Sequence, residues 1–292
     1  MTSIKIIGNP GRYDVEKIKK WLVESFKKLG LSLEEIHLVF LEDLKQWEKL
    51  YQRYVNHIED LSSEEKSSRA DIYFSVVKTA AYIHDSQRKK GLPPTILIGK
   101  GDSDSKLSIA EDSFLHEAAH ILEDKNGWSK VIVEAINLIS QDYQMSWGSL
   151  TQQNAGHFHL FTLLDQSVAD FFVDTLWCQQ GLFETLFKYQ RKKTNRWIKY
   201  IQLKEGSSDI YVFGSVVRAA FWTTLPPNYP KKEDEKKLEE MIIDRIRQME
   251  MEPLYRKIRS AVAKLETPPK INNIYKCETE IIELAQDFFE KQ

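Results

Sequence analysis

One segment near the middle of the chain, residues 113–124, constrains the fold more than any other. It reads S-F-L-H-E-A-A-H-I-L-E-D, and apolar residues occupy most positions around its histidines and first glutamate. A helix on a protein surface normally carries its apolar residues on one stripe, so this composition predicts a helix that is buried on most sides. Asp112 and Ser113 belong to residue types that favour the beginning of a helix. We therefore expect the rest of the chain to pack around this segment.

Two of the seven histidines, His116 and His120, lie in this segment, with Glu117 beside the first. Residues at positions i and i+4 share one face of a helix, so both imidazoles can reach one ion at about 2 Å. Glu117 is rotated by one residue, where it can reach a water molecule at the ion but is badly placed to be a ligand beside both histidines. The pattern predicts a metal site with a general base. The alternative is a structural helix that happens to carry histidines.

The length and composition of the chain allow an enzyme and exclude some other classes. A chain of 292 residues can form one large domain or two closely packed ones. Its net charge of -2 gives no basic field, so we predict no nucleic-acid partner. Cys178 and Cys277 form no C-x-x-C pair, so we expect inert thiols. The chain shows no signal peptide and no apolar run long enough to span a membrane, which predicts a cytoplasmic protein; nothing in it sets an oligomeric state.

Local patterns divide the chain into a mixed first part and a helical second part. Short β-branched apolar runs predict strands at 4–7, 36–41 and 95–98. Helical spacing predicts helices at 15–29, between Asp14 and Gly30, and at about 71–88. After Gly127 the strand signal fades, and helices are predicted at 128–143, 161–178, 183–203, 209–224 and 233–265, with a terminal helix after a linker at 267–269.

These patterns predict an α+β fold in two parts. Residues 1–126 form an α/β subdomain with a small mixed sheet that ends in the H-E-x-x-H helix. Residues 127–292 form a mainly helical subdomain that completes an active-site cleft.

A strand, a loop, an H-E-x-x-H helix and a helical half, in this order, resemble the zincin metallopeptidases. His116, Glu117 and His120 match the motif of that superfamily in residue type and spacing. The metzincin branch continues with x-x-G-x-x-H, but this chain has Glu123 and Asn126 at those two positions. The gluzincin branch takes its third ligand from a later helix with an E-x-x-A-D or E-x-x-x-D pattern. The segment 165–174, D-Q-S-V-A-D-F-F-V-D, resembles that helix. Among the zincins the chain is therefore most similar to the gluzincins, with an atypical helix for the third ligand.

The third metal ligand has two leading candidates. If Ala169 and Asp170 correspond to the A-D of the family pattern, the ligand position falls on Gln166, an amide where a carboxylate is expected. Alternatively, Asp170 is the ligand, and Asp174, one turn later, orients a histidine. Zinc sites prefer anionic or imidazole ligands, so we rank Asp170 before Gln166.

Four other residues remain as candidates for this ligand: Asp165, Glu134, His157 and His159. On an extended segment, His157 and His159 would share a side; the alternative is that they are loop histidines before a helix. The remaining histidines, His37, His57 and His84, form no such pattern, and we interpret them as surface or strand-packing residues.

The resemblance implies a zinc-dependent metallopeptidase with one Zn²⁺ per chain, a peptide or protein substrate, and Glu117 as general base. The substrate would lie along an edge strand, for which 95–98 is the first candidate. Candidate donors to the oxyanion are Tyr143, His157, His159 and Tyr211. Two other interpretations remain: a catalytically weakened zincin-like scaffold that binds a peptide or protein, and a structural helix in an interaction protein.

Overall fold

The structure is a computed structural model that describes residues 2–11, 13–41, 53–54, 80–85, 88–99, 110–143, 155–202, 209–224 and 233–290. The chain forms two compact units, Met1–Ser129 and Lys130–Gln292. The boundaries inferred from the sequence, 1–126 and 127–292, and the cleft assigned to the second part stay predictions.

The described residues of the first unit include a mixed sheet of four strands. Its strands are β1 (Ser3–Ile7), β2 (Glu35–Leu41), β3 (Ala80–Ile83) and β4 (Thr95–Gly99), in the order β1-β2-β4-β3. β1 and β4 both pair with β2 in parallel, whereas β3 pairs with β4 in the antiparallel direction. β2 and β4 are buried along most of their length, as expected of apolar strands between two neighbours. β3 therefore lies at an edge of this sheet.

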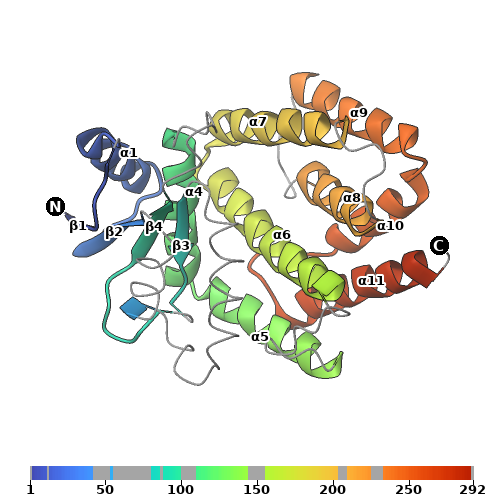
Figure 1. The fold of residues 1–292 in the computed structure, drawn as a ribbon, viewed down its shortest axis with the longest axis horizontal. Helices are drawn as coiled ribbons and strands as arrows, with labels where there is room; N and C mark the ends of the chain where they lie inside the picture. Colours follow the sequence, from blue (N-terminus) through green and yellow to red (C-terminus); the bar gives the residue numbers. More distant parts are fainter. Residues whose placement is uncertain are drawn as a thin grey trace. The chain divides into compact units, whose positions relative to one another are not determined.

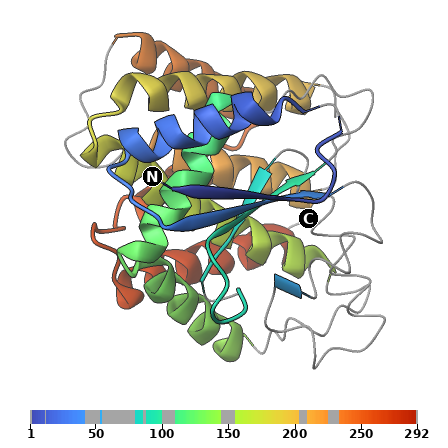
Figure 2. The same ribbon diagram turned by 90° about the vertical axis from the view of Figure 1, so that its left-hand side faces the viewer.

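In the described part of the first unit, helices α1 (Val15–Lys28) and α4 (Glu111–Lys125) contact each other. Figure 2 shows α1 running alongside β1 and β2. The Asp14 side chain accepts a hydrogen bond from the Lys17 N–H and caps α1, and Gly30 follows the helix with a φ of 64°. α4 also contacts β3. The edge of the sheet and the H-E-x-x-H helix are thus adjacent.

Two predictions for this unit are wrong. The helix expected at 71–88 is not formed in its described part, because Ala80–Ile83 is strand β3. The edge strand expected at 95–98 is β4, which lies between β2 and β3 inside the sheet. Both errors have one cause: the pairing of Ala80–Ile83 with β4 is a contact between distant parts of the chain, and local periodicity does not contain it.

The second unit is helical. It contains most of α5 (Trp128–Asp142), followed by α6 (Ala155–Gln179), α7 (Phe183–Gln202), α8 (Asp209–Thr223), α9 (Glu233–Gln248), α10 (Glu252–Val262) and α11 (Ile271–Glu290). α8 is its central element, because α6, α7, α9 and α10 all contact it (Figure 1). Its buried residues include Phe213, Val216, Val217 and Ala220.

The single helix predicted at 233–265 is two helices. Glu250, between α9 and α10, has a φ of 60°, which a continuous α-helix does not allow. Pro253 lies in the first turn of α10, where its missing N–H costs no helical hydrogen bond.

The fold class is confirmed at the level of an α+β protein that is mostly helical and has a small mixed sheet. Among the described residues, no helix combines the length and the apolar character that crossing a membrane requires.

Candidate metal centre

The H-E-x-x-H residues lie together on a buried part of α4. His116, Glu117 and His120 are 8%, 7% and 8% exposed. The ring centroids of the two histidines are 4.8 Å apart, with the ring planes at 85°. The i, i+4 spacing brings these rings next to each other, and burial removes most of the water that would compete with an ion for them.

A buried acid orients His120. The His120 Nδ1–H donates to Oε2 of Glu123 at 2.9 Å, and Glu123 is fully buried. Because the carboxylate takes the Nδ1 proton, the lone pair of the neutral ring is on Nε2, the arrangement found in metal-ligating histidines. In the sequence, Glu123 stands out only as a departure from the metzincin pattern. Its i, i+3 spacing from His120 was the signal that could have identified it.

Glu117 contacts the edge strand. Its Oε2 accepts a hydrogen bond from the Tyr82 backbone N–H at 2.7 Å, and both groups are buried. Tyr82 belongs to β3, so the candidate general base is held between α4 and the edge of the sheet.

His84, which directly follows β3, is a third histidine beside this group. Its ring lies 5.0 Å from that of His120 at an interplanar angle of 81°, and its side chain is 23% exposed. Its Nδ1 is 3.4 Å from Oδ1 of Asp124. The interpretation of His84 as a surface or strand-packing residue did not include this position, because nothing local in the sequence links His84 to α4.

Asp124 connects the end of β3 to α4. Its carboxylate accepts hydrogen bonds from the Tyr82 hydroxyl at 2.7 Å, the Asp85 N–H at 2.8 Å and the Ser129 hydroxyl. Burial opposes ionisation, but the interactions with His84, Ser129 and Tyr82 outweigh it and lower the pKa of Asp124 to about 2. Asp124 is therefore a carboxylate at neutral pH and can orient His84.

His84, His120 and Glu123 each offer one ligand atom, and these atoms lie within 4.8 Å of one another. Zinc binds nitrogen and carboxylate oxygen at about 2 Å. Small side-chain adjustments would bring the three atoms to that distance from one ion.

The candidate third ligands lie on α6 in the helical unit. Asp170 has a side chain that is 32% exposed, and its Oδ2 accepts a hydrogen bond from Nζ of Lys193 on α7 at 2.8 Å. Asp174 is buried, and its Oδ2 accepts from the Gln190 amide at 3.1 Å. Gln166 is exposed. Each of the two aspartates thus has a hydrogen-bond donor on α7.

The other candidates fare differently. His157 and His159 lie in α6, so neither the extended segment nor the loop before a helix that was considered for them is formed. Glu134 is exposed on α5, so the apolar enclosure considered for it is absent. His37 packs in β2 against Tyr54, as a strand-packing residue does. The side chains of His157, His159 and Tyr211, and the whole of His57, lie outside the described residues.

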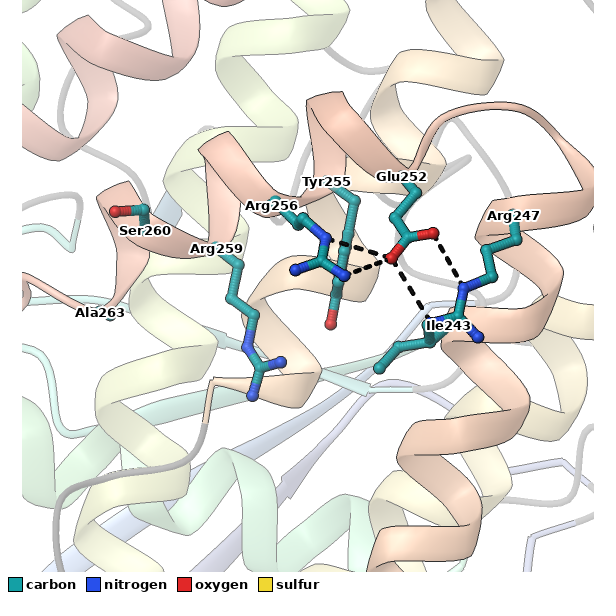
Figure 3. A pocket seen from close by; sticks show the side chains of 8 residues that line it. All are labelled: Ile243, Arg247, Glu252, Tyr255, Arg256, Arg259, Ser260 and Ala263. Atoms are coloured by element: carbon teal, nitrogen blue, oxygen red, sulfur yellow. Dashed lines mark hydrogen bonds and ion pairs between the residues drawn. The ribbon is translucent and has the colours of Figure 1, made fainter.

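A pocket between α9 and α10 in the helical unit is lined by none of the candidate metal ligands. It has a volume of about 390 Å³, and Figure 3 shows Arg247 and Arg256 both directed at Glu252. Arg259 pairs with Glu239 at 2.7 Å. Because each of these guanidinium groups has a carboxylate partner, the arrangement stabilises the junction of the two helices.

Comparison of the chain with protein-family models, with curated proteins and with solved structures found no match.

Proposed function

We propose that this protein is a zinc-dependent metallopeptidase, with His116 and His120 as metal ligands and Glu117 as general base. The observation that carries the proposal is the buried pair of imidazoles on α4, in which Glu123 takes the Nδ1 proton of His120. The order of elements along the chain also supports the proposal. A strand (β4), the H-E-x-x-H helix (α4) and a helical unit follow one another, as in the zincins.

The donor set fits zinc. Two neutral imidazoles on one helix face, one of them oriented by a carboxylate, are typical ligands of this ion. When bound, zinc would lower the pKa of a coordinated water to about 7 and polarise the carbonyl of a substrate.

Glu117 is the group that moves the proton in this proposal. It accepts a proton from the attacking water and transfers it to the leaving amine. The Tyr82 N–H holds one carboxylate oxygen, Oε2, and the other oxygen is the one assigned to the water. This hydrogen bond holds the carboxylate in position.

Asp170 is proposed as the third ligand and Gln166 as the alternative, as inferred from the sequence. The carboxylate of Asp170 is partly exposed, whereas that of Asp174 is buried and bonded to Gln190. This difference supports Asp170 as a ligand and Asp174 as a group that positions its surroundings.

The test is a comparison of the wild type with Glu117→Gln. We expect the variant to keep its zinc and to lose peptidase turnover by at least about 100-fold, the scale for loss of a general base. A peptide library supplies substrates, and metal analysis of both proteins supplies the control. Equal turnover in the two proteins would contradict the assigned base.

A second candidate function is a zincin-like scaffold that binds a peptide or protein without hydrolysing it. The observation in its favour is that Lys193 already pairs with Asp170, the proposed third ligand. Under this alternative, the wild type binds peptides from the library and leaves them intact with zinc present.

A further inference from the structure

One group of metal-ligating side chains lies beside the proposed catalytic residues but is not the same set. It consists of His84 at the end of β3 and of His120 and Glu123 on α4, with their ligand atoms within 4.8 Å of one another. Two imidazoles and a carboxylate suit Zn²⁺ and similar ions such as Co²⁺ and Ni²⁺. All three residues belong to the first unit.

Glu123 supplies an independent sign of a ligand. The residue is fully buried, and its Oε2 is bonded to His120. Its other oxygen, Oε1, is buried and has no hydrogen-bond partner among the described residues. A buried carboxylate oxygen without a donor is unfavourable, because it has given up its hydrogen bonds to water. A cation beside Oε1 would remove this cost.

His84 is oriented as metal-ligating histidines are. Its Nδ1 faces the Asp124 carboxylate at 3.4 Å, and Asp124 is in turn held by Tyr82 and Ser129. A carboxylate on one ring nitrogen leaves the other nitrogen, Nε2, for an ion. Asp124 thus orients His84 with Nε2 available to an ion.

We propose that His84, His120 and Glu123 form a second binding site for a divalent transition-metal ion, in addition to the site of the proposed function. The two sites share His120. A neutral imidazole has one lone pair, which is on Nε2 while Nδ1 donates to Glu123, and on Nδ1 once Glu123 and His120 bind an ion together. The sites therefore exclude each other, and their relative affinities for the ion decide which of them is occupied.

The test uses His116→Ala, which removes a ligand of the proposed catalytic site and none of the second. We expect this variant to bind one Co²⁺ per chain, measured by calorimetric titration and by the visible absorption of the bound ion. Adding His84→Ala, or separately Glu123→Gln, lowers that affinity by at least about tenfold. Glu134→Gln, an exposed acid on α5, is the matched control and leaves it unchanged. Circular dichroism confirms that each variant is folded. The His84 side chain is partly exposed, so we expect His84→Ala to disturb the fold less than Glu123→Gln.

Two outcomes would overturn the proposal: a folded His116→Ala protein that binds no Co²⁺ at millimolar concentration, or equal affinities with and without His84. These outcomes are separate from the fate of the proposed function, which rests on peptidase turnover and Glu117. A protein without peptidase activity whose His116→Ala variant still binds Co²⁺ through His84 would keep the second site and lose the proposed function.

Discussion

Two groups of buried acids, one in each unit of this protein, differ in the hydrogen-bond donors around them. In the first unit, Glu117, Glu123 and Asp124 each accept a hydrogen bond from the edge of the sheet or from a histidine. In the helical unit, Asp165 on α6 and Glu278 on α11 have buried carboxylate oxygens for which the described residues supply no donor. Burial raises the pKa of Asp165 to about 7, and burial together with Asp165 raises that of Glu278 well above its usual range.

The comparison separates two uses of a buried carboxyl group. An acid with donors stays ionised and can orient a histidine or attract a cation. A buried acid without donors has a raised pKa and stays protonated to higher pH, so the free energy of unfolding depends on pH. An ionised carboxylate of the first kind suits a metal centre, because it can bind a cation or orient a ligand.

The largest expected effect concerns His120, which both proposed metal sites use. His120→Ala should weaken zinc binding by more than about 100-fold, because no arrangement of the remaining ligands replaces it. Competition with a chelator measures the affinity. His37→Ala, a change of a buried histidine on β2, is the control for general destabilisation. Equal zinc affinity in wild type and His120→Ala would place the ion elsewhere.

Replacing a candidate third ligand should lower zinc affinity less than replacing His120, and it distinguishes Asp170 from Gln166. Asp170→Asn should weaken zinc binding more than Gln166→Ala, because an amide removes the charge that helps to neutralise Zn²⁺. If Asp170 instead orients a ligand, its loss costs about 10 to 100-fold, and Gln166→Ala costs as much or more. Chelator titration of both variants ranks them. No change in either variant would mean that neither residue is a ligand.

The carboxyl pair of the helical unit should make its stability fall as the pH rises. At low pH both the folded and the unfolded chain hold the protons. From about pH 4, where an ordinary carboxyl ionises, to about pH 7 for Asp165 the folded chain holds more protons than the unfolded one, so the free energy of unfolding decreases. Asp165→Asn should reduce this dependence. Thermal unfolding of both proteins at several pH values measures it, and parallel curves would show that Asp165 does not titrate in this way.

The smallest effect is expected at Lys193, which pairs with Asp170 across α6 and α7. Lys193→Met removes a cation that competes with zinc for this carboxylate, so zinc affinity should rise. Because both side chains are partly exposed, the gain should be at most about fivefold, the worth of such an ion pair. Lys188→Met on the same helix is the control. A loss of affinity would show that Lys193 supports the position of Asp170.

Local pattern was enough for much of the fold. The three β-branched runs are strands, α1 begins after its predicted cap, and most of the predicted helices of the second part are present. The i, i+4 spacing also correctly anticipated that His116 and His120 share one face of a buried helix. Each of these features depends on residues within a few turns of one another, so the sequence contains the information directly.

What only the tertiary structure decided is the surroundings of that helix. The pairing of Ala80–Ile83 with β4 makes β3 the edge strand, brings the Tyr82 N–H to Glu117 and places His84 beside His120. These contacts join segments that are distant in the chain. Their free energy comes from burial and from hydrogen bonds that exist only when β3 is paired with β4. The sequence determined which helix could hold a metal, whereas the fold decided which strand and which histidine stand next to it.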